Sequence, residues 1–325
     1  MCSFMNDEIC ATTIIVEQSL SINNDFPFIE KESQIHNNEW DIIVKDSINM
    51  KRTIRITSHK LICAETLYLE FSHLEKFLML FDGCFLEIRN IHFETGELAD
   101  ASLEFLSEEY AKKRLKFYVT NKVFCQEGKL LDWKDFLTDS IYSKWKLLLK
   151  ELDITHQIFL YCTANDGVPM ELKLPFLIEC AEPIIELITI ETGRFSSLSP
   201  GNRGTSLKMC LDAIISSYGM DIFSGEYAEP VEFTQRLVNT RVRIMHIKRN
   251  SEKDVIAGMD IHLYAVKMSL LYRRVLLDLL GIDYQNYSQN LKRIVTVPRL
   301  PDQRLRRYGG WHWCCRTGTG TALHG

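Results

Sequence analysis

Hydrophobic and polar positions follow two different patterns along the chain, and the change falls near residue 130. Before it, short runs rich in β-branched residues are separated by charged and polar residues, a pattern typical of strands. A helical pattern over 72–80 and a turn at Asp82-Gly83 interrupt these runs. We expect a β-rich N-terminal domain over 1–130, with strands at 40–44, 53–57, 66–71 and 85–91 and a hairpin at 117–124.

After residue 130, apolar residues recur at spacings of three and four, as in amphipathic helices. Pro230 is placed to open one of these helices, Pro183 suggests a kink in another, and Gly281 is placed to end the last. The pattern predicts a connecting helix over 131–149 and a helical domain over 150–297. The predicted fold class is therefore α+β. The expected helices cover 133–152, 154–163, 171–192, 206–218, 230–245 and 255–280.

The last segment, 298–325, differs in composition from the rest of the chain. It contains five glycines, five arginines and two tryptophans but no lysine. We interpret it as an atypical, disordered tail. His312, Cys314 and Cys315 are close together in the sequence, but three clustered ligands without a fourth partner are weak evidence for zinc, so no metal site is predicted.

Composition and charge narrow the functional classes. The chain has 43 acidic and 38 basic residues, so its net charge of −5 gives no general attraction to nucleic acid. The ten cysteines include no CxxC pair, which favours free thiols in a reducing compartment. The N-terminus has no signal-peptide pattern and no run of apolar residues is long enough to span a membrane. We expect a cytoplasmic protein that needs neither a cofactor nor a metal.

The segment 233–251 is the exception to this charge balance, because it contains no acidic residue. Its cations form a local positive patch, for which phosphate is the natural partner. A phosphate-bearing molecule is therefore the expected partner, and the chemistry and resemblance described below imply RNA. The candidate RNA-binding residues are Arg236, Arg243, Lys248 and Arg249, beside Arg241 and His246.

Arg241 and His246 form the candidate catalytic pair. Five helical steps turn roughly 140° and rise about 7.5 Å, so the two residues do not share one narrow helix face. Histidine can give or take a proton near neutral pH, and arginine can bind phosphate oxygens as negative charge builds. RNA supplies its own nucleophile in the 2′-hydroxyl, which DNA lacks. The ordinary alternative is an exposed basic helix face that carries a surface histidine.

The string LVNTRVRIMH over 237–246 resembles the LVNTRN…TH pattern of ApeA-type HEPN domains. The helical patterns LKMCLDAIISSYG before it and LYAVKMSLLYRRVLLDLLG after it are similar to that family as well. The resemblance implies a metal-independent endoribonuclease of the bacterial antiviral or toxin type, used in abortive infection. It maps the family arginine to Arg241 and the family histidine to His246, with Asn239 and Thr240 as supporting residues. It also implies a symmetric homodimer and an N-terminal domain that senses a phage-derived trigger.

Two residues depart from the family pattern, because Val242 and Met245 stand where polar residues are usual. A non-catalytic dimer that binds RNA, a nucleotide or a protein therefore stays open as the alternative. We interpret His59, His73, His92, His156 and His262 as isolated histidines. Arg273-Arg274 are expected on a solvated face or as an extension of the basic surface.

Overall fold

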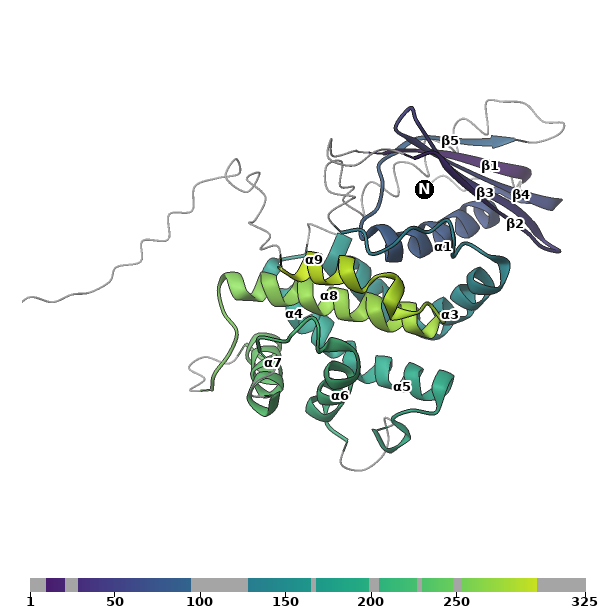
Figure 1. The fold of residues 1–325 in the computed structure, drawn as a ribbon. Coiled ribbons are helices and arrows are strands. Elements are labelled where there is room, and N and C mark those ends of the chain that lie inside the picture. The colour runs from purple at the N-terminus through teal and green to yellow at the C-terminus, as the bar shows by residue number, and fades with distance from the viewer. Residues whose placement is uncertain are drawn as a thin grey trace, which may run out of the picture.

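The structure is a computed structural model, and it describes residues 10–20, 29–94, 128–164, 168–198, 205–226, 230–247 and 253–296. An antiparallel sheet of five strands forms the N-terminal part, in the order β2-β3-β4-β1-β5. Helix α1 (Ala64–Asp82) lies between β4 and β5 in the chain, and the other helices follow β5 (Figure 1). The predicted α+β class is confirmed. The strands are β1 Cys10–Ser19, β2 Lys31–His36, β3 Trp40–Ser47, β4 Lys51–Cys63 and β5 Ile88–Glu94.

One face of the sheet is apolar and packs on helix α1, Ala64–Asp82 (Figure 1). Alternate residues of the central strands, such as Ile14, Ile42 and Ile56, are fully buried on that face, as the two-residue period of a strand requires. The helix ends at Gly83, whose backbone is left-handed. A Cβ at Gly83 would lie 2.5 Å from the carbonyl oxygen of Gly128, so glycine is needed there.

The predicted strand at 66–71 is wrong, because these residues belong to α1. Leu67, Phe71 and Leu74 follow the helical spacing of four and three residues, and all three side chains are buried. Six residues of alternation were too short a window to separate the two periods. The predicted strands at 40–44 and 53–57 lie within β3 and β4, and the prediction at 85–91 overlaps β5. The predicted hairpin at 117–124 lies outside the described residues.

The helical part confirms most of the predicted helices, with shifted ends. The predicted start at 133 is wrong, because 133–138 form turns before α3, and α3 continues through a kink at Asp153. The last long helix begins at Met259 rather than at 255. The helices are α3 Asp139–Ala164, α4 Met170–Glu179, α5 Ala181–Thr192, α6 Leu207–Ile214, α7 Pro230–Met245, α8 Met259–Leu279 and α9 Ser288–Thr296, with a π-helical turn at Ile215–Gly219 and 3-10 turns at Ser196–Leu198 and Tyr284–Asn286.

The break between α4 and α5 falls at Cys180 instead of forming a kink at Pro183. Pro183 lies in the first turn of α5, where its missing N–H costs no hydrogen bond. Its ring would clash with the carbonyl of Glu179 in a continuous helix, so the chain begins a new helix at Ala181. This break leaves Glu179 as the last residue of α4.

Arg273 of α8 joins the helical part to the end of α1, and its predicted position on a solvated face is wrong. The side chain is buried, and its guanidinium donates to the carbonyl oxygens of Leu80, Phe81 and Gly128 at distances between 2.6 and 3.2 Å. Leu80 and Phe81 lie in the last turn of α1, where carbonyls lack partners in their own helix. A cation at that end also interacts favourably with the helix dipole.

Among the described residues, no helix is long and apolar enough to cross a membrane. The predicted tail at 298–325 lies outside the described residues. The domain boundaries predicted at 130, 149 and 297 stay predictions.

Candidate functional site

Helix α7 carries the candidate catalytic pair and has the bounds predicted for it, Pro230–Met245. Phe233, Leu237 and Thr240 are buried on one side of this helix, which packs against α4 and α6. The opposite side is polar and basic. The helix ends just before His246, and Ile247 has a φ of 48°, which turns the chain away from the helical path.

Arg241 lies on the side of α7 that faces α4. Its Nε donates to a carboxylate oxygen of Glu179, and both side chains are partly exposed. A guanidinium has five N–H donors, and only the one at Nε is given to this carboxylate. The ion pair therefore fixes the direction of the guanidinium plane and leaves its outer nitrogens for a further anion.

His246 lies one residue beyond the end of α7, and its side chain is exposed. Its backbone N–H still donates to the carbonyl of Val242 at 3.2 Å, so the residue continues the last turn. Within the described part of the chain, no contact joins its imidazole to Arg241. The two members of the motif therefore point to different surroundings within one protomer, as their separation along the helix requires.

Asn239 and Thr240 hold the chain that follows α7 against that helix. The amide of Asn239 donates to the carbonyl of Asp254 at 3.2 Å. The hydroxyl of Thr240 accepts from the backbone N–H of Ile256 at 2.8 Å and donates to the carbonyl of Arg236 at 2.7 Å. The amide oxygen of Asn239 also accepts from the side-chain amide of Gln235 at 3.0 Å, so both side chains have structural hydrogen-bond partners.

The predicted RNA-binding cations differ in their surroundings. Arg236 forms an ion pair with Asp254, with an Nε–Oδ2 distance of 2.6 Å, so an acid from outside 233–251 neutralises part of the basic segment. Arg243 is exposed in the last turn of α7. Lys248 and Arg249 lie outside the described residues. Among the described cations of the segment, Arg243 is therefore exposed and Arg236 has an acidic partner.

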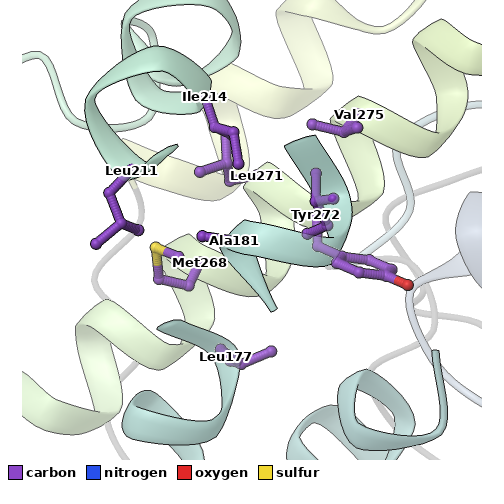
Figure 2. A pocket seen from close by; sticks show the side chains of 9 residues that line it. Leu177, Ala181, Leu211, Ile214, Met268, Leu271, Tyr272 and Val275 are labelled. Atoms are coloured by element: carbon purple, nitrogen blue, oxygen red, sulfur yellow. The ribbon is translucent and has the colours of Figure 1, made fainter. Parts of the chain in front are cut away.

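A pocket in the helical part lies between α4, α5, α6 and α8 (Figure 2). Apolar side chains line it, including Leu177, Ile214 and Met268. The hydroxyl of Tyr272 at its edge lies 3.3 Å from Nδ1 of His156. The lining has no carboxylate, imidazole, amine or guanidinium, so we interpret the pocket as a packing gap of the core.

Sequence reasoning missed two features of the described chain. Glu179 was not singled out, although it is the ion-pair partner of Arg241 across 62 residues. His59 was interpreted as isolated, but it lies beside Asp41 and His36 in a group whose ligand atoms are all within 4.8 Å of one another. Strand register brings that group together, so no local sequence signal marks it. It lies on the sheet and not on α7.

The buried thiols fit a packing role. Burial raises the pKa of Cys180 and of Cys162 to about 12, with a nearby cysteine and Glu179 adding to the effect at Cys180. The pKa of Cys210 is raised to about 11, chiefly by burial. A thiol with such a pKa is a poor nucleophile at neutral pH.

Comparison with known proteins gives one family. Residues 184–286 match the family model described as Apea-like HEPN, which covers just under a third of the 325-residue chain and includes all of α7 with Arg241 and His246. No curated protein and no solved structure matches the chain. The match confirms the resemblance that the string over 237–246 carries. Over residues 184–286 the chain is therefore similar to the Apea-like HEPN family.

Proposed function

We propose that this chain is a metal-independent endoribonuclease that acts in bacterial antiphage defence by abortive infection. His246 is the general acid or base, and Arg241 stabilises the charge on the scissile phosphate. The observation that carries the proposal is the Arg241-x4-His246 motif at the end of α7 inside the HEPN match. An exposed histidine can move protons, and an arginine that gives only its Nε–H to a partner within the described residues can bind a phosphate.

The proposed reaction uses the ribose itself as the nucleophile. The 2′-oxygen attacks the adjacent phosphorus and forms a new O–P bond while the bond from phosphorus to the 5′-oxygen breaks. One imidazole takes the proton of the 2′-hydroxyl, and a second gives a proton to the leaving 5′-oxygen. The products are a 2′,3′-cyclic phosphate and a 5′-hydroxyl, so no metal ion and no water is needed in this step.

A homodimer supplies the two imidazoles. Arg241 is directed to α4 by Glu179, whereas His246 lies exposed beyond the helix end. We infer that the α7 ends lie near a two-fold axis, so that both arginines and both histidines line one composite site. A mixed dimer of wild type and H246A then keeps only one of the two imidazoles and should cut at least about 100-fold more slowly than the wild-type dimer. If Arg241 and His246 of one protomer were sufficient, this mixed dimer would keep about half of the wild-type activity.

The main test is cleavage of RNA by tag-free protein in EDTA, comparing wild type with H246A. General acid–base catalysis contributes about 100- to 10,000-fold, so H246A should lose at least about 100-fold in rate with its dimer intact. The exposed His92 of β5 gives a matched control, and H92A should cut as wild type does. New 3′ ends should carry cyclic phosphate. Cleavage that stops in EDTA and returns with Mg²⁺, or that H246A retains, contradicts the mechanism.

The second candidate is a non-catalytic dimer that binds RNA, a nucleotide or a protein. The Arg241–Glu179 ion pair favours it, because it partly neutralises the arginine, and Val242 and Met245 depart from the family pattern. A dimer that binds RNA equally well as wild type and as H246A, and cuts it in neither form, supports this candidate. Cultures infected with phage make the same distinction, since only a nuclease gives His246-dependent growth arrest.

A further inference from the structure

Three polar side chains meet on the face of the sheet that points away from α1. His36 ends β2, Asp41 is the second residue of β3, and His59 lies near the end of β4. Their chain neighbours Ile35, Trp40 and Ile42 are buried on the α1 side. Because successive side chains of a strand alternate between faces, the three polar residues share the outer face.

Strand register, and not chance proximity of flexible chains, places these residues together. His36 is paired directly with Asp41 across the β2–β3 ladder. Asp41 is paired with Thr57 of β4, so His59 is its diagonal neighbour two residues along the same face. The backbone N–H of His59 also donates to the carbonyl of Glu39 at 3.2 Å, which holds the β2–β3 turn against β4.

The carboxylate of Asp41 lies between the two imidazoles. One oxygen contacts Nδ1 of His36, and the other lies 3.2 Å from Nε2 of His59. The two rings are 5.5 Å apart between centroids. The carboxylate and both histidines together present three potential ligand atoms within 4.8 Å of one another. Tetrahedral ligands at zinc bond lengths of about 2.0–2.1 Å are separated by roughly 3.3 Å, so small side-chain rotations bring these atoms to that spacing.

His59 is also oriented as a metal ligand usually is. Its Nδ1 lies 3.2 Å from the backbone carbonyl of Asn38. A hydrogen bond from Nδ1–H to a carbonyl fixes the tautomer that leaves the lone pair on Nε2, the nitrogen beside Asp41. The side chains of His36, Asp41 and His59 are 79%, 42% and 33% exposed, so an ion can enter from solvent without any movement of the backbone.

We propose that His36, Asp41 and His59 form a binding site for one divalent transition-metal ion, with Zn²⁺ as the expected ion. Two imidazoles and one carboxylate are borderline ligands that suit Zn²⁺ better than Mg²⁺ or Ca²⁺, which prefer oxygen alone. The ion links β2, β3 and β4 on the outer face. Three protein ligands leave a fourth position for water or for a donor atom of a bound molecule. The inference does not depend on RNA cleavage.

The test is calorimetric titration of Zn²⁺ into tag-free, full-length protein that has been stripped with a chelator. Wild type should bind one more zinc ion per chain than the H36A/H59A double variant, and each single histidine variant should bind that ion at least about tenfold more weakly. Because the cysteines can also bind zinc, the quantity that decides the test is the difference in bound zinc per chain between wild type and each variant. H92A removes an exposed histidine from β5 of the same sheet and should bind as wild type does.

D41N keeps the shape of Asp41 but removes its charge, so it gives the answer even where the double variant fails to fold. It should lose the same ion, and Zn²⁺ should raise the melting temperature of wild type but not that of D41N. Equal zinc binding by wild type, D41N and the double variant overturns the proposal and leaves Asp41 as a carboxylate hydrogen-bonded to two histidines. These readouts measure metal alone, so they are independent of whether H246A abolishes cleavage.

Discussion

Two arginine–histidine groups of the helical part have similar chemistry and opposite surroundings. In the buried group, Arg273 is beside Tyr272, whose hydroxyl lies 3.3 Å from His156. Arg273 and His156 are 3% and 2% exposed. In the exposed group at the end of α7, Arg241 has a partly exposed acid as its partner and His246 lies in solvent.

The two groups differ in the hydrogen-bond acceptors of their arginines. Arg273 donates to backbone carbonyls of two chain segments that are distant in sequence, so its donors are committed to the fold. Arg241 has a side-chain partner on one nitrogen and can exchange or add an anion. The buried group therefore holds the two parts of the chain together, and the exposed group is available for chemistry.

The largest expected effect is a difference in the free energy of unfolding between variants of Arg273 and of Arg241. R273A leaves the buried carbonyls of Leu80 and Gly128 without their donor, and we expect the free energy of unfolding to fall by about 3 kcal/mol or more. R241A removes a partly exposed ion pair and should change that free energy by less than about 1 kcal/mol. Urea denaturation measures both. If the proposed function is correct, R241A also loses RNA cleavage at a temperature where the variant is fully folded.

If the two arginine variants were equally stable, the junction between α1 and α8 would not depend on Arg273. If R273A lost cleavage while remaining fully folded, the division between a structural and a functional arginine would be wrong.

The next expected effect is that the buried histidine, His156, makes the free energy of unfolding depend on pH. Burial, with a smaller contribution from Lys76, lowers the pKa of His156 from 6.5 to about 3. Between these values the unfolded chain binds a proton that the folded chain does not, so stability falls as the pH falls below 6.5. The loss from this residue is about 2 kcal/mol between pH 7.5 and 5. Urea denaturation of H156N across that range should lack this part of the slope.

Y272F provides the control for this comparison, since it removes the hydroxyl that faces His156 but keeps the imidazole. Its absolute stability should fall, while the dependence on pH should remain. A wild-type slope in H156N would show that other groups cause the acid sensitivity.

The sequence predicts a structural feature well when all the residues that determine it lie in one continuous segment. The bounds of α7 were predicted because Pro230 and the apolar spacing of that helix lie in one continuous segment. The strand error at 66–71 arose because a short alternation fits either period. Arg273 was misplaced because its carbonyl partner Leu80 lies 193 residues away, and no pattern around Arg273 distinguishes a buried guanidinium from a solvated one.

The same limit applies to the two sites. The motif of Arg241 and His246 lies within six residues, so the sequence revealed it. Its partner Glu179 is on another helix, and the break that exposes it follows from the packing of Pro183 in a new helix. The group of His36 and His59 forms only once the register of three strands is set.

A smaller effect tests whether Glu179 positions Arg241 or sequesters it. E179Q keeps an oxygen that accepts from Nε of Arg241, and it also removes a negative charge near the RNA. We therefore expect E179Q to cut RNA at least as fast as wild type. E179A lets the guanidinium swing, and cleavage should fall about tenfold. Steady-state kinetics on one RNA substrate measure both. Faster cleavage by E179A than by wild type would mean that the ion pair holds Arg241 away from phosphate.

The smallest expected effect concerns Arg243, the exposed cation in the last turn of α7. A contact to phosphate contributes mainly through release of counterions, so R243A should weaken RNA binding about threefold. The slope of log affinity against log salt should fall by the contribution of roughly one phosphate contact. Binding is measured in an H246A background, where RNA stays intact. R89A, which removes an arginine from β5, is the control and should leave the slope unchanged. A slope that R243A leaves unchanged would show that Arg243 does not contact phosphate, because every phosphate contact that is lost lowers the salt dependence of binding. Exposure at the end of α7 would then not be enough to make an arginine part of the RNA site, and the contrast with the buried group would rest on Arg241 and the remaining predicted cations.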